Sequence, residues 1–75
     1  MHHDEWVIIN AAMNHYLSHL HETEEALHRA VFLADRGWDI KDVEIKRAQL
    51  PLVRRELEDA RSLYIDLSID NAHHD

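Results

Sequence analysis

The chain has 75 residues, no cysteine, one glycine and one proline, which excludes a multidomain protein, a disulfide framework and a thiolate metal site. Apolar residues make up 45% of the sequence, too many for a disordered segment. The formal net charge of −7 argues against nucleic acid and anionic membranes as partners, because both require a basic surface. We therefore expect a single acidic domain over residues 1–75, with the cytoplasm as its simplest location.

The first predicted element is a long helix over about residues 4–36, a stretch without glycine or proline. Its apolar residues recur at alternating intervals of three and four, which is the pattern of a helical packing seam. Ala12, Ala26 and Leu33 widen this seam on one side, and Leu17 and Val31 widen it on the other. A stripe this broad predicts contact with more than one neighbouring helix. Uninterrupted apolar runs such as Trp6 to Ile9 are too short to span a membrane.

The predicted turn covers residues 37–39. Gly37 is the only glycine and lies where the helical pattern stops, so we expect it to end the first helix in a left-handed conformation. Asp39 is the expected N-cap of the second helix, and Asp42 adds negative charge to its first turn. Phe32 lies outside the stripe, and we expect its ring to pack against Trp38 or its neighbours over the turn, or against another chain.

A second helix is predicted over about residues 40–69. Its apolar pattern is regular from Leu50 to Leu67, whereas Ile45 and Leu52 follow a shifted phase. Pro51 lies at the changeover and predicts either a kinked helix or a break. We favour the kinked continuous helix, because the residues before Pro51 are poor N-caps.

Two legs of similar length joined by a short turn predict an all-α fold, an antiparallel two-helix hairpin. A lone hairpin leaves a broad apolar stripe half exposed, so we expect two copies to associate into a four-helix bundle. The residues expected to form the buried interface follow the 3-4 spacing of the two legs. They are Trp6, Ile9, Met13, Tyr16, Leu20, Leu27, Leu50, Val53, Leu57, Tyr64 and Leu67.

Histidine is abundant, with eight residues in the chain. His15 and His19 are one helical turn apart, and His21, Glu25 and His28 share a second face, so either set is a candidate zinc or nickel site with further ligands from another helix or chain. Glu25 and His28 also have the Glu-x-x-His spacing of di-iron bundles, but both lie outside the seam. At the two ends, His2-His3-Asp4 and His73-His74-Asp75 would meet if the hairpin closes.

The sequence favours a non-enzymatic, self-associating protein-interaction module, most simply a homodimer, that has an acidic surface, needs no cofactor and binds a protein partner of unknown identity. One glycine cannot build a phosphate loop or a nucleophile elbow. Two alternatives remain open. One is a metal-binding bundle that uses the histidines of the first helix, and the other is an acidic mimic that blocks a nucleic-acid-binding protein.

Overall fold

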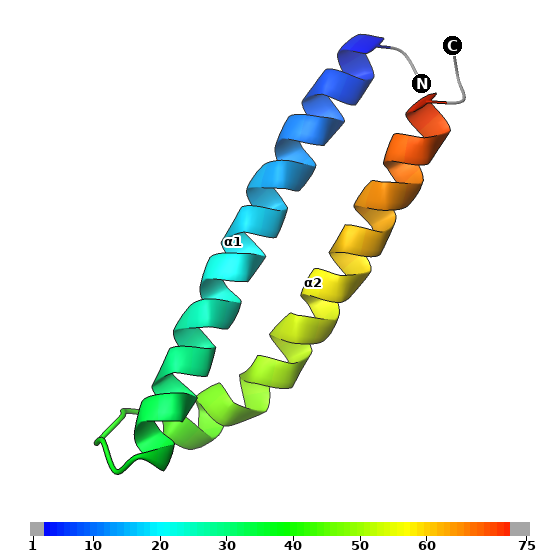
Figure 1. The fold of residues 1–75 in the computed structure, drawn as a ribbon. Helices are drawn as coiled ribbons and strands as arrows, with labels where there is room; N and C mark the ends of the chain where they lie inside the picture. Colours follow the sequence, from blue (N-terminus) through cyan, green and yellow to red (C-terminus); the bar gives the residue numbers. More distant parts are fainter. Residues whose placement is uncertain (1–2, 73–75) are drawn as a thin grey trace.

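The computed structural model describes residues 3–72 and contains two helices, α1 (His3–Asp35) and α2 (Val43–Ala72). They run antiparallel side by side, with the chain ends together at one end and the connection at the other (Figure 1). The all-α hairpin predicted from the sequence is confirmed. It is an elongated rod of 55 × 16 × 15 Å, with a radius of gyration of 16.7 Å against about 11 Å for a compact chain of this length.

The C-terminus of α1 is closed by backbone hydrogen bonds around Gly37. The Trp38 amide donates to the Leu33 carbonyl over 3.1 Å, and the Gly37 amide donates to the Ala34 carbonyl over 3.1 Å. Gly37 has a φ of 94°, which confirms the expected left-handed residue after the helix. This pair of bonds is a Schellman motif, and it satisfies carbonyl groups that the end of the helix would otherwise leave unpaired.

The connection to α2 is longer than predicted, because α2 begins at Val43 and not near Ile40. The prediction that Asp39 is the N-cap of α2 was wrong. Asp42 precedes the first helical residue, and its carbonyl accepts the first helical hydrogen bond from the Lys46 amide over 3.0 Å. Asp42 has a φ of 56°, a left-handed conformation that no helical residue adopts, so the helix cannot extend back through it.

Phe32, near the end of α1, does not pack against Trp38 as expected. The Arg36 guanidinium lies 3.3 Å from the centre of the Phe32 ring, and the His28 ring centre lies 6.4 Å away on the same helix. Trp38 is 64% exposed. A cation therefore covers a face of the Phe32 ring. Packing of Phe32 against Ile40, Val43 or another chain, which the sequence also allowed, stays a prediction.

A single helix continues through Pro51, so the alternative of a break in the second leg is not realised. Figure 1 shows α2 changing direction in its yellow-green part, where Pro51 lies. Proline lacks the amide proton and crowds the preceding turn, which accounts for the bend. Leu50, the residue before it, is buried, so the bend keeps the start of α2 against α1.

The core is small and lies in the middle of the rod and towards the turn. The buried residues among those described are Leu20, Leu27, Leu50, Leu57 and Ala60. Leu20, Leu57 and Ala60 form one cluster, with Leu17 packed against it. Towards the chain ends, no described residue before Leu20 or after Ala60 is buried.

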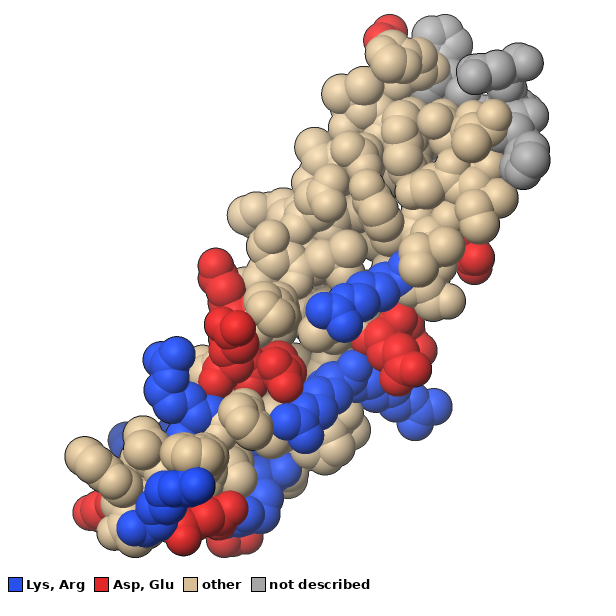
Figure 2. All heavy atoms as spheres, viewed as in Figure 1, with Lys and Arg blue, Asp and Glu red and all other residues tan. Residues whose placement is uncertain are grey.

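Charge is distributed unevenly along the rod. All eight lysine and arginine residues lie between Arg29 and Arg61, and all but Arg61 lie in the part of the hairpin nearer the turn. On the face drawn in Figure 2, charged side chains crowd that part and are sparse towards the chain ends. Neither described helix combines the length and apolar character that a membrane-spanning segment needs. We call the part nearer the turn the turn half and the part nearer the chain ends the terminal half.

Candidate functional site

The residues predicted as a buried interface line the contact between α1 and α2 of one chain. Leu20, Leu27, Leu50 and Leu57 are buried there. A further six are half-buried, namely Trp6, Ile9, Met13, Val53, Tyr64 and Leu67. Tyr16 is exposed. Most of the predicted seam is therefore occupied by the partner helix of the same hairpin.

Aromatic and polar contacts join the helices in the terminal half. The rings of Trp6 and Tyr64 are 6.2 Å apart between centroids, and the Tyr64 hydroxyl donates to Asn10 Oδ1 over 2.5 Å. Closer to the middle, the Tyr16 hydroxyl donates to Glu56 Oε1 over 3.0 Å. The carboxylate acceptor, followed by partial burial and the negative charge of Glu56, raises the pKa of Tyr16 above its usual 10.0. These contacts fix the register of the two helices where few residues are buried.

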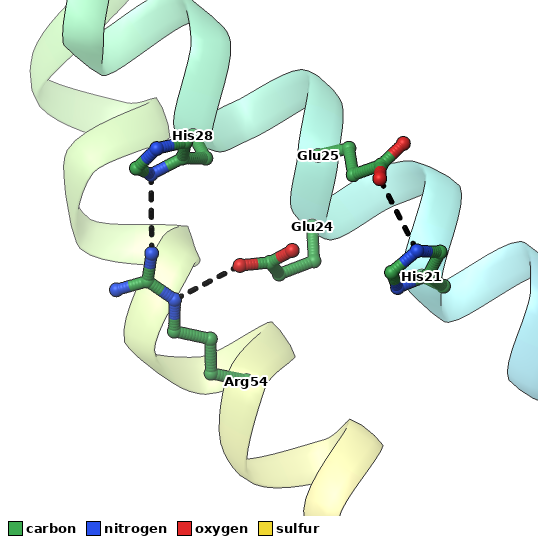
Figure 3. Close-up of polar contacts among 5 residues, drawn as sticks. All are labelled: His21, Glu24, Glu25, His28 and Arg54. Carbon is green, nitrogen blue, oxygen red and sulfur yellow. Dashed lines mark hydrogen bonds and ion pairs between the residues drawn. The ribbon is translucent and has the colours of Figure 1, made fainter.

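The predicted metal ligands of the second set separate in the structure. Figure 3 shows His21 and Glu25 facing each other along α1, and His28 facing Arg54 of α2. His21 Nε2 lies 3.2 Å from Glu25 Oε1, and Arg54 Nη2 lies 3.2 Å from His28 Nδ1. An arginine can only donate, so His28 Nδ1 accepts and its lone pair is already engaged.

Arg54 also contacts Glu24, whose carboxylate Oε1 lies 3.1 Å from Arg54 Nε. Arg54 thus joins two residues of α1 that are one helical turn apart. We call Glu24, His28 and Arg54, all drawn in Figure 3, the interhelix clamp. A partly exposed ion pair of this kind stabilises by ~0.5 kcal/mol. This partner of His28 could not be predicted from the sequence, because pairing across the hairpin depends on the register of the two helices.

His15 and His19 are both exposed on α1. Within residues 3–72, no three histidine or carboxylate side chains converge as a metal-binding group. A site built on either predicted set would need ligands from a second chain. His2, His73, His74 and Asp75 of the predicted terminal cluster lie outside the described residues.

Three shallow hollows lie on the side of the hairpin that carries Arg54. One, of about 430 Å³, lies between the helices beside Arg54 and Leu57, and an adjoining one of about 250 Å³ lies beside Leu17 and Arg61. A third, of about 320 Å³, lies along α1 beside His28 and Phe32. Half of the polar side chains that line them are already paired with one another, such as Glu24 with Arg54. This is a solvated polar face with no enclosed cavity.

A different side of the hairpin carries large apolar residues in contact with water. Ile8 is 70% exposed and Leu52 is 67% exposed. Further exposed apolar residues include Ile45 and Leu63. The sequence did contain a signal for them, because Ile45 and Leu52 are out of phase with the seam that faces α1. Comparison of the chain with protein-family models, with curated proteins and with solved structures gives no match.

Proposed function

We propose that this chain is a non-enzymatic, self-associating helical module, in which two hairpins form a four-helix bundle that presents an acidic, histidine-bearing surface to a protein partner. The observation that carries the proposal is the mismatch between buried and exposed apolar residues. Five described residues are buried, whereas ten large apolar residues are exposed. Apolar surface in water is unfavourable by about 25 cal/mol per Å², so association gains free energy.

The surface area supports a dimer quantitatively. A compact monomer of 8.9 kDa exposes about 4,800 Å², whereas this chain exposes 5806 Å². The excess, roughly 1,000 Å², is close to the area that each partner contributes to a stable protein interface. One additional hairpin is therefore enough to bring the exposed area per chain to the value of an ordinary compact protein.

Sedimentation equilibrium over micromolar to millimolar protein tests this proposal. We expect a mass of twice 8.9 kDa in the upper part of that range, with reversible dissociation on dilution. A species that keeps the mass of one chain up to millimolar concentration would contradict it.

A further inference from the structure

Two stripes of residues on one side of the hairpin have a symmetric spacing. On α1 the spacings are four, seven, seven and four residues, which keep side chains on one side of a helix. The α1 stripe consists of Ile8, Ala12, His19, Ala26 and Ala30. His19 is the central residue of this stripe, so the spacing is the same in both directions from it. On α2, Leu52 and Leu63 lie five and six residues to either side of Leu57, which clusters with Leu20 of α1. Glu56 and Asp59 lie between the two leucines on the same side of α2.

The hydrogen bond from Tyr16 to Glu56 places the two stripes on the same side of the molecule. Tyr16 is four residues from Ala12 and three from His19, and Glu56 is four residues from Leu52. Arg54 is two residues from Glu56 and therefore points to the opposite side of α2, where it contacts α1 through Glu24. We call the side with the two stripes the symmetric face and the side with Arg54 the clamp face.

The symmetric face is suited to a second copy of itself. Its α1 stripe contains no carboxylate, lysine or arginine. On α2 the face carries two carboxylates, Glu56, which accepts the Tyr16 hydroxyl, and Asp59. In an isologous dimer, each residue contacts a counterpart that is related by the two-fold axis. The symmetric spacing then places Ile8 against Ala30 of the second copy, Ala12 against Ala26, and Leu52 against Leu63. These three pairs join apolar side chains. The same register brings Glu56 near Asp59 of the second copy, a pair of like charges that opposes association.

Charge decides between the two ways of stacking the faces. In the terminal half, Arg61 near the middle of the rod is the one basic residue, whereas the acidic residues include Asp4, Asp66 and Asp70. The turn half carries the other seven basic residues together with a similar number of acidic ones. Stacking with both turns at one end would bring two acidic terminal halves together, whereas stacking with the turns at opposite ends places each beside a half whose charges nearly balance. Only the second arrangement packs α1 antiparallel on the α1 of the second copy, as the symmetric spacing requires.

We infer that two copies associate through their symmetric faces with the turns at opposite ends, so that the two His19 residues meet at the two-fold axis. The inference rests on the proposed self-association and specifies its geometry. In the alternative stacking, α1 helices lie diagonally across the bundle, roughly 14 Å apart between axes. That separation is too long for a disulfide between the two copies of residue 19, which needs Cα atoms within about 7 Å.

Cysteine cross-linking tests the arrangement, because the natural chain contains no cysteine. His19→Cys is compared with Ser18→Cys, a neighbouring exposed position that points away from the symmetric face. Each variant is oxidised in glutathione buffer at a concentration where sedimentation gives a dimer, and its helix content is checked by circular dichroism. We expect covalent dimer to form at least tenfold faster for His19→Cys on non-reducing electrophoresis.

A double variant, Leu52→Cys with Leu63→Cys, provides an independent arm. The two cysteines lie on one helix about 16 Å apart and cannot pair within a chain. We expect covalent dimer at least tenfold faster than for Leu52→Cys alone. Both cross-links in a sedimenting dimer support the arrangement, and the absence of either overturns it while the proposed function stands. A chain that sediments as a monomer overturns both.

Discussion

The turn half and the terminal half of the hairpin are stabilised in different ways. In the turn half, the Schellman bonds of Gly37, the Arg54 clamp and the 2.8 Å ion pair between Asp35 and Arg47 satisfy polar groups within the chain. In the terminal half, few charges are present, and Ile8, Leu63 and Ile69 are exposed. The difference indicates that polar contacts within one chain fix the turn half, whereas fewer such contacts fix the terminal half. Large apolar residues are exposed in both halves, Leu52 and Ile45 in the turn half among them, and the proposed association would cover part of this surface.

Among the substitutions considered, one in the core should lower the stability of the hairpin most. Leu57→Ala removes a buried side chain from the cluster with Leu20 and Ala60, and we expect a loss of about 2–3 kcal/mol in the free energy of unfolding. Leu52→Ala is the control, since Leu52 is exposed in a single hairpin. Urea unfolding followed by circular dichroism at low protein concentration measures both. Equal losses would mean that the core is not where the structure places it.

Substitutions that alter the backbone conformation of the turn should have the second largest effect on stability. Gly37→Ala adds a Cβ that meets no atom within 4 Å, so its cost of about 1 kcal/mol arises from the positive φ alone. Asp42 also has a positive φ, so Asp42→Gly removes strain and offsets the loss of a capping residue. We expect thermal unfolding to be lowered by Gly37→Ala and nearly unchanged by Asp42→Gly. A loss of stability in Asp42→Gly as large as that in Gly37→Ala would contradict this account of the turn.

The smallest effect concerns the pH dependence of the Tyr16 hydrogen bond. Its acceptor, Glu56, raises the pKa of Tyr16, so the stabilising contribution is complete below the unfolded value of about 10 and is lost as the pH rises through the folded value. Glu56→Gln should lower the pKa of Tyr16 towards its usual value in an ultraviolet absorbance titration. Glu58→Gln, on the clamp face, should leave the titration unchanged. If the tyrosine titration is the same in the natural chain and in Glu56→Gln, the hydrogen bond between Tyr16 and Glu56 does not form in solution.

Helix formation and the end of α1 could be predicted from the sequence, because they depend on local chemistry. The 3-4 spacing requires helices, and a single glycine after it leaves one place for a left-handed residue. The start of α2 could not be predicted as reliably, since Asp39 and Asp42 are both good caps three residues apart. The left-handed conformation of Asp42 decided between them, and that conformation depends on the whole connection.

The candidate site depended on long-range geometry that the sequence lacks. The clamp joins His28 to Arg54, which are 26 residues apart in the sequence. It forms only in one register of the two helices. The symmetric face was visible in part, because Ile45 and Leu52 broke the phase of the seam. Its relation to α1 became clear only through the contact between Tyr16 and Glu56.

The most direct test of the account compares two exposed residues of the terminal half, Leu63 and Ile65. They are two positions apart on α2 and 52% and 55% exposed, but they point to opposite sides of the helix. Leu63→Glu and Ile65→Glu add the same charge, so the dimer association constants of the two variants from sedimentation equilibrium isolate the effect of the face.

Burying one leucine is worth about 1.5–3 kcal/mol, which corresponds to at least a tenfold change in association. The account predicts that Leu63→Glu weakens dimerisation by at least that factor and that Ile65→Glu changes it by less than about twofold. Equal weakening by both variants, or stronger weakening by Ile65→Glu, would contradict association through the symmetric face.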